Sequence, residues 1–153
     1  METGNLTIDA QAAFARQRRR GRLERLARWV RRSRDAGRLP CLDEAMALRV
    51  NRRALGLQEV ALASIQGTTE PAKANAFDRV FRPSSASRGR WERLWIAGRR
   101  GAPLPPISLV RLGDRHFVDD GHHRVSVARA LGMAAIDAEV VELALGTSRF
   151  HAR

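Results

Sequence analysis

The sequence has almost no cysteine and no long apolar run, and each shortage excludes a class of protein. Cys41 is the only cysteine among 153 residues, so the chain cannot form a disulfide within itself, and a cytoplasmic location fits this composition. No apolar stretch approaches the ~20 residues that a helix needs to cross a bilayer. The N-terminus has no basic segment followed by an apolar one. We therefore expect no secretory signal and no membrane partner.

Lysine is also nearly absent, because Lys73 is the only one and 27 of the 28 basic residues are arginine. The chain has only 16 acidic residues, and its formal net charge is +12. This excess indicates a polyanionic partner such as nucleic acid or nucleotide phosphates. A GC-rich coding sequence could produce the same arginine bias. In either case arginine is the better bidentate ligand for phosphate.

Apolar residues make up 44% of the chain, which is enough for a folded core. There is no internal repeat and no low-complexity tract. The pattern of apolar, basic and turn-forming residues divides the chain into four predicted parts. These are a flexible tail at residues 1–8, a basic helical region at 9–56, an α+β domain at 57–143 and a C-terminal tail at 144–153.

The basic region contains apolar residues at helical spacing. Leu23, Leu26 and Val30 form one stripe, which predicts a helix over 9–35 that packs on the domain or on a second copy of the chain. A second helix is expected over 42–55. A homodimer is compatible with this pattern.

Arginines cover the remaining faces of the first predicted helix. They could follow a nucleic-acid backbone, or they could simply be solvated. On the first interpretation, the contacts to DNA or RNA would come from Arg18, Arg19, Arg22 and Arg25.

The last third of the chain has the clearest alternation of strand and helix patterns. Two strands flank the hairpin signal Gly113-Asp114, and a helix and a final strand follow. Farther upstream a short strand and a helix are expected, and Arg88 and Arg90 next to that helix could reach a phosphate. The predicted ranges are strands at 59–64, 107–112, 115–119 and 135–143, and helices at 90–99 and 122–131.

The stretch FVDDGHHRVSVARALG places many titratable groups where a strand changes into a helix. Asp120 is expected to be the N-cap of the helix, and Gly121 permits a tight bend and the close approach of a ligand. His122, His123 and Arg124 follow at the positive end of the helix, where basic side chains are unfavourable unless an anion binds. We predict a phosphate-binding turn made of these five residues, with a solvated turn as the alternative.

A dedicated metal site is not expected at this turn. Adjacent residues on a helix point about 100° apart, so His122 and His123 do not converge on one ion. Mg²⁺ carried by a nucleotide, with Asp119 or Asp120 nearby, fits the residues better.

The segment from Pro105 to Glu142, PPISLVRLGDRHFVDDGHHRVSVARALGMAAIDAEVVE, resembles the ParB/sulfiredoxin-like domain. It has the Pro-rich entry, the strand and hairpin, the Gly-x-x-Arg turn, a helix ending in Leu-Gly and a final strand. The resemblance implies a small α+β domain with a mixed sheet and a strand–Gly–helix turn that binds phosphate. ParB proteins use this turn for CTP, and sulfiredoxins and ADP-dependent free serine kinases use it for adenine nucleotides. It implies that Gly121, His122, His123 and Arg124 hold the phosphates of a nucleoside di- or triphosphate with Mg²⁺.

The chain departs from two branches of that family. Sulfiredoxins carry a nucleophilic cysteine where this chain has His122, and Cys41 lies outside the domain, so the sequence predicts no sulfiredoxin chemistry. ParB partition proteins carry Gly-Glu-Arg-Arg at the turn and a helix-turn-helix region after it, and neither is present here. The serine kinases share Asp-Gly-His-x-Arg, which begins here at Asp120, and need a carboxylate base, for which Glu59 and Glu70 are candidates.

The leading hypothesis is a ParB-like nucleotide-binding module with a regulatory role, associated with nucleic acid. The alternative is an enzyme, a phosphotransferase resembling the free-amino-acid kinases or a nuclease, that uses the same turn with His122 or His123 as acid–base. A structural domain with an empty relic site is the third hypothesis.

Overall fold

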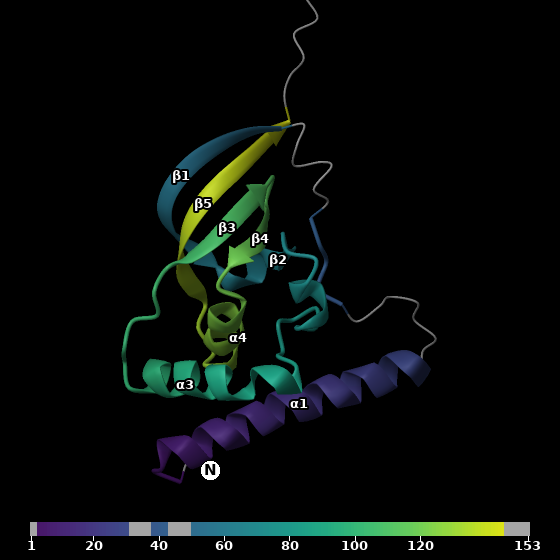
Figure 1. The fold of residues 1–153 in the computed structure, drawn as a ribbon, viewed down its shortest axis with the longest axis vertical. Coiled ribbons are helices and arrows are strands. Elements are labelled where there is room, and N and C mark those ends of the chain that lie inside the picture. Colours follow the sequence, from purple (N-terminus) through teal and green to yellow (C-terminus); the bar gives the residue numbers. More distant parts are fainter. Residues whose placement is uncertain (1–2, 31–37, 43–49, 146–153) are drawn as a thin grey trace, which may run out of the picture.

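The computed structural model describes residues 3–30, 38–42 and 50–145, and it combines one sheet with a group of helices (Figure 1). The sheet lies at one end of the molecule, α4 lies beneath it, and α3 and α1 form the opposite end. The helices are α1 (Leu6–Val30), α3 (Arg88–Arg99) and α4 (His122–Ala130), and short 3-10 turns cover Leu62–Ser64, Lys73–Asn75 and Ser85–Ser87. The strands are β1 (Val50–Ala61), β2 (Ile65–Thr68), β3 (Ile107–Leu112), β4 (Arg115–Asp120) and β5 (Ala135–Leu145).

The sheet has five strands in the order β1-β5-β3-β4-β2. β1 pairs with β5 and β3 with β4 in antiparallel fashion, whereas β3 pairs with β5 and β2 with β4 in parallel. The predicted α+β class with a mixed sheet is therefore confirmed. The hairpin prediction is confirmed as well, because Leu112 pairs with Arg115 across a two-residue turn in which Gly113 has φ +60°.

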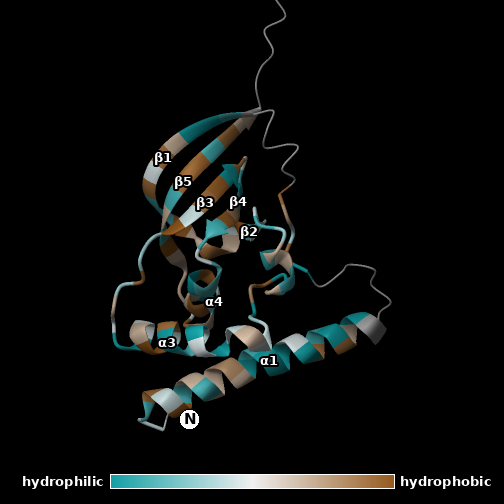
Figure 2. Cartoon of the chain, viewed as in Figure 1, coloured by the Kyte–Doolittle hydropathy of each residue, from teal (hydrophilic) through white to brown (hydrophobic). Residues whose placement is uncertain are grey.

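The main core lies between the sheet and α4. Ile107 and Leu109 of β3, Val118 of β4 and Val140 of β5 are almost fully buried with Val125 of α4. Figure 2 shows hydrophobic residues along the central strands and hydrophilic residues over much of α1. The buried strands thus fix α4, and with it the turn before α4, against the sheet.

A second core joins α1 to α3 and α4. Ala13 and Phe14 of α1 are buried against Trp91 and Trp95 of α3, and the rings of Phe14 and Trp91 meet edge to face with centroids 5.6 Å apart. The indole of Trp91 donates a hydrogen bond to Ser126 Oγ of α4 at 2.8 Å. α1 is therefore docked through its N-terminal half.

Three details of the helical region differ from the prediction. α1 begins at Leu6 instead of 9, because Asn5 Oδ1 accepts the amide of Thr7 at 3.0 Å and starts the helix earlier. Residues 50–55 belong to β1, so the helix prediction is wrong there: pairing with β5 outweighs the local helical pattern. Residues 31–37 and 43–49, and the tail beyond residue 145, lie outside the described residues.

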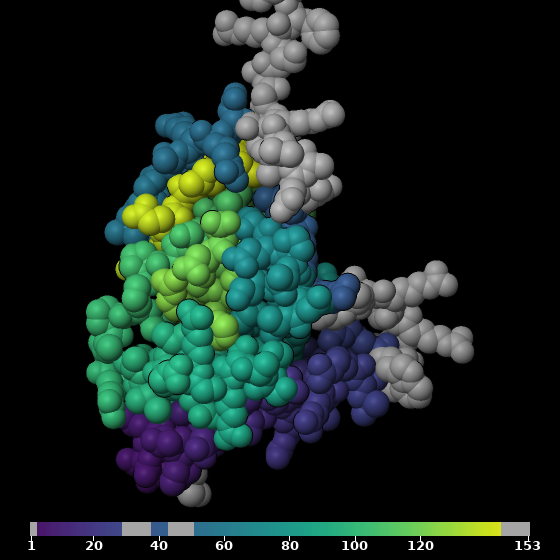
Figure 3. Space-filling model, in the orientation of Figure 1, coloured from purple at the N-terminus to yellow at the C-terminus, as the bar shows by residue number. Residues whose placement is uncertain are grey.

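The predicted packing of the leucine stripe on the domain is wrong. Leu23 and Leu26 are 61% and 59% exposed, because α1 continues past the body of the molecule there (Figure 3). Packing of this stripe on a second copy stays a prediction. None of the helices in the described part of the chain has both the length and the apolar composition of a bilayer span.

Candidate functional site

A cavity of about 320 Å³ opens where β4 passes into α4. The five residues of the predicted phosphate-binding turn all line it. Four residues from other segments complete the wall, and two of them are basic. The lining residues are Lys73, Arg90, Leu94, Pro105, Asp120, Gly121, His122, His123 and Arg124.

Gly121 determines the shape of the turn. Its φ of +106° lies in the left-handed region that favours glycine, and it is the N-cap of α4. A Cβ at this position would lie 2.8 Å from Ile107 Cβ and 3.3 Å from Arg124 Cζ, so the turn packs directly on β3. The predicted tight bend at Gly121 is therefore confirmed, whereas the predicted close approach of a ligand stays a prediction.

The prediction that Asp120 caps α4 is wrong. No side chain of the described residues caps this helix, and Asp120 Oδ2 instead accepts a hydrogen bond from Arg124 Nη2 at 2.6 Å. Gly121, with its left-handed backbone, is itself the N-cap residue, and Asp120 comes one residue before it. As a result, the first-turn amides of α4 are left without a side-chain acceptor, at the end of the helix that attracts anions.

Arg124 is largely engaged within the chain. Its Nη1 donates to the carbonyl of Pro105 at 2.9 Å and also to that of Pro106, in addition to the ion pair with Asp120. These bonds tie the entry of β3 to the start of α4. The guanidinium therefore positions the wall of the cavity, and only its remaining N–H groups are available to a ligand.

His122 is a buried anchor of the turn. It is 3% exposed, it stacks on Phe77 with centroids 5.7 Å apart, and its Nε2 lies 2.7 Å from Thr68 Oγ1. Burial lowers the pKa of His122 to about 4, and the nearby charge of Lys73 acts in the same direction. The ring is therefore neutral at pH 7 and brings no positive charge to a phosphate.

His123 is neutral for the same reason. Burial lowers its pKa to about 4, with contributions from the charges of Arg90 and Lys73. Its ring meets Phe77 edge to face at 5.1 Å. Its Nε2 is buried and has no hydrogen-bond partner among the described residues. A ligand or water that reached Nε2 would satisfy this atom.

The positive charge of the cavity comes from Lys73 and Arg90. Both line the wall, and neither side chain has an acidic partner in the described part of the chain. Arg88, by contrast, is held by Glu92 at 2.7 Å. The sequence drew attention to Arg90 but not to Lys73, which comes from a distant turn that no motif connects with residues 120–124.

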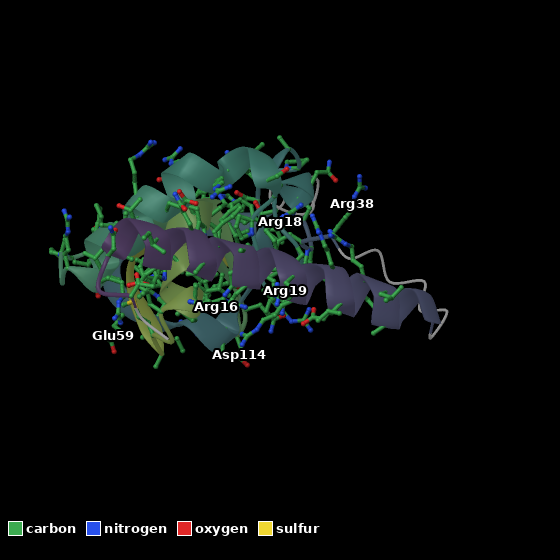
Figure 4. All side chains as sticks on the ribbon, turned by 90° about the horizontal axis from the view of Figure 1, so that it is seen from below. Arg16, Arg18, Arg19, Arg38, Glu59 and Asp114 are labelled. Atoms are coloured by element: carbon green, nitrogen blue, oxygen red, sulfur yellow. The ribbon has the colours of Figure 1, made fainter. Side chains whose placement is uncertain are left out.

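The predicted nucleic-acid contacts of α1 do not share one face. Arg18 and Arg25 line a second cavity, whereas Arg19 and Arg22 are exposed and do not line it. Figure 4 shows Arg18 and Arg38 on one side of α1 and Arg16 and Arg19 on the other.

Acidic residues near the turn do not form a cluster. Asp119 Oδ1 accepts a hydrogen bond from Thr69 Oγ1 at 2.7 Å, and Asp120 is paired with Arg124. Within residues 3–30, 38–42 and 50–145, no three His, Cys, Asp or Glu side chains gather as a group that could hold a metal ion.

Comparison with known proteins finds similarity among solved structures. No family model matches the chain, and no curated protein matches it. A crystal structure of sulfiredoxin from Arabidopsis thaliana is similar, with a TM-score of 0.41 and 18% sequence identity over 55% of this chain and 82% of the sulfiredoxin chain. The chain is an α+β protein with a mixed sheet, and a basic cavity lies at its strand–Gly–helix turn.

Proposed function

We propose that this chain is a nucleoside-phosphate-binding module with a regulatory role that associates with nucleic acid. The observation that carries the proposal is the cavity at Gly121. It is lined by the start of α4, whose first-turn amides have no side-chain cap, and by Lys73 and Arg90, which have no acidic partner among the described residues. Helix N-termini, lysine and arginine are the usual protein ligands of phosphate. Asp120, the only acid in the lining, is neutralised by Arg124.

The cavity also suits the rest of a nucleotide. Its volume of about 320 Å³ lies at the lower end of the ~300–1,000 Å³ range that is typical of small-molecule sites. Leu94 and Pro105 offer apolar surface for the sugar or base, and His123 Nε2 offers a hydrogen-bonding atom. Asp119 or Asp120 would lie beside Mg²⁺ carried by the phosphates, and the metal would supply further charge neutralisation there.

The enzyme alternative has less support. A base with a pKa of about 4 accepts protons poorly at pH 7, which applies to both His122 and His123. The other candidate bases, Glu59 and Glu70, do not line the cavity. These observations favour binding over phosphotransfer or nuclease activity.

Calorimetric titration with CTP, ATP, ADP and GTP in the presence of Mg²⁺ tests the proposal. We expect at least one to bind, and Arg90→Ala to weaken binding about tenfold, which is the effect of losing one charge-assisted contact. Arg93→Ala is the matched control, because Arg93 is exposed on the same helix and does not line the cavity. Lys73→Ala should act like Arg90→Ala.

Absence of binding for all four nucleotides would overturn the proposal, and equal loss in the Arg90 and Arg93 variants would place the site elsewhere. Turnover of a bound nucleotide or of nucleic acid, followed by product analysis, would support the enzyme alternative instead. Light scattering coupled to size exclusion tests the predicted homodimer.

A further inference from the structure

A second basic cavity lies between α1 and the segment that carries Phe77. Its volume is about 140 Å³. Gly21 of α1 faces the opposite wall, where a Cβ would be in ordinary contact, 3.6 Å from Asp78 Oδ2 and 3.8 Å from Arg82 Cδ. We call this cavity the α1 cleft. Its lining residues are Gln17, Arg18, Gly21, Arg25, Arg38, Ala74, Asn75, Ala76, Phe77, Asp78, Arg82, Pro83 and Ser84.

One of the four arginines of the α1 cleft neutralises the acids around it. Arg82 Nη2 lies 2.5 Å from Glu24 Oε1 on α1, and Arg82 Nη1 lies 3.3 Å from Asp78 Oδ2. The hydrogen bond from Arg82 also lowers the pKa of Glu24. Asp78 Oδ1 is occupied by the amides of Val80 and Arg82 at 3.0 and 2.9 Å. Arg82 therefore stabilises the cleft and its charge is already balanced.

The other three arginines have no acidic partner among the described residues. Arg18 Nη1 reaches across the cleft to the carbonyl of Pro83 at 3.5 Å, which is a neutral acceptor. Arg25 is exposed and lies about two helical turns after Arg18 on α1. Arg38 lies outside α1, and its backbone pairs with that of Asp78. Three arginines from two segments thus line one small cavity. Figure 4 shows two of them, Arg18 and Arg38, on the same side of α1.

The volume of the α1 cleft and the spacing of its arginines indicate which ligand it fits. The cleft volume of about 140 Å³ is less than half that of the Gly121 cavity and below the ~300–1,000 Å³ of typical small-molecule sites, so the cleft suits a phosphate group better than a whole nucleotide. Arg18 and Arg25 are seven residues apart, or ~10 Å along the helix axis at 1.5 Å per residue. A nucleic-acid strand carries a phosphate every ~3.4 Å of duplex rise, so it can place separate phosphates next to Arg18 and Arg25. A single small anion provides only one charged group.

We propose that the α1 cleft binds phosphates of a nucleic-acid backbone through Arg18, Arg25 and Arg38, with Arg82 as a positioning residue. This inference rests on the nucleic-acid part of the proposed function and is independent of the nucleotide cavity at Gly121. Arg19 and Arg22, which the sequence pattern grouped with Arg18 and Arg25, lie outside the cleft.

Fluorescence anisotropy with short single-stranded RNA, single-stranded DNA and duplex DNA over a range of salt concentrations tests the proposal on the full chain. The triple variant Arg18→Gln/Arg25→Gln/Arg38→Gln should bind the preferred nucleic acid at least about tenfold more weakly. Its slope of log affinity against log salt should fall by about 2, since each lost contact removes ~0.7–0.9 from the slope. The control triple Arg19→Gln/Arg22→Gln/Arg53→Gln removes the same charge from exposed positions outside the cleft and should change the slope less.

Equal losses in the two triples would overturn the proposal, because a diffuse basic surface would then explain the binding. If the wild-type chain bound no nucleic acid, the nucleic-acid part of the proposed function would fall with it, while titration with nucleotides would still judge the Gly121 cavity separately. Arg38→Gln alone changes an exposed residue outside any helix, so it should fold normally. An unchanged salt slope in that variant would also contradict the proposal.

Discussion

At the scale of single residues, the conformation of the turn depends on Gly121. Alanine there would combine a left-handed φ with a steric clash on Ile107. We expect Gly121→Ala to lower the free energy of unfolding by about 2–4 kcal/mol in urea denaturation. Gly132→Ala is the control, because Gly132 has φ +73° and a Cβ there meets nothing within 4 Å. Equal losses in both variants would mean that β3 is not packed against the turn.

The buried histidines predict how stability depends on pH. The unfolded chain protonates its histidines near pH 6.5, while His122 and His123 in the folded chain stay neutral down to about pH 4. Between these values the unfolded state binds more protons, so stability is fully present above pH 6.5 and is lost as the pH falls towards 4. For His122 alone the loss is about 3 kcal/mol. His116, whose pKa is also lowered by burial, acts in the same direction.

Urea denaturation at a series of pH values measures this loss, and NMR titration of the imidazole Cε1–H signals assigns it to individual residues. Signals of His122 or His123 that titrate at pH 6.5 would contradict the burial of these rings.

At the scale of elements, the docking of α1 depends on its N-terminal half. Phe14 is 5% exposed and packs on Trp91, whereas Leu23 on the same helix is 61% exposed. We expect Phe14→Ala to cost about 3–5 kcal/mol of unfolding free energy and Leu23→Ala less than about 0.5 kcal/mol. Chemical denaturation of the two variants compares them directly. Similar costs would show that the leucine stripe is covered in solution, as a second copy would cover it.

The packing of α1 on α3 also determines how a chain without α1 would behave in nucleic-acid binding experiments. Removal of α1 would expose Trp91 and the apolar residues around it, so lost binding in such a fragment would not separate lost contacts from lost folding. Point variants of the arginines avoid this difficulty, because glutamine is also a good helix former.

At the scale of the whole molecule, the two basic cavities both border the segment 73–78. Lys73 lines the Gly121 cavity, residues 74–78 line the α1 cleft, and Phe77 packs on His122 and His123. Their linings share no residue. The cavities are therefore expected to act separately, with different ligands.

We expect a double dissociation in binding at physiological salt, where long-range charge effects are screened beyond ~8 Å. Arg90→Ala should weaken nucleotide binding and leave the affinity for nucleic acid within about twofold, and the Arg18/Arg25/Arg38 triple should do the reverse. Calorimetry with nucleotide and anisotropy with nucleic acid, on both variants, measure the two effects. Loss of both activities in either variant would mean that the cavities form one site.

Much of the C-terminal half of the fold follows from local sequence patterns. The apolar run in ISLVRL, the Gly113-Asp114 turn and the helix before Gly132 are local signals, and local sterics decide them. Gly121 was recognisable for the same reason, because its need for an unusual φ comes from the turn between strand and helix.

Which side chains are charged and which are free to bind a ligand depends instead on tertiary contacts. Burial under Phe77 makes His122 and His123 neutral, and the carbonyls of Pro105 and Pro106 engage Arg124. Lys73 and Arg38 reach their cavities from distant segments, and β1 forms because β5 is there to pair with it. Desolvation, hydrogen bonding and strand pairing arise from neighbours far along the chain, and for that reason a local pattern does not contain them.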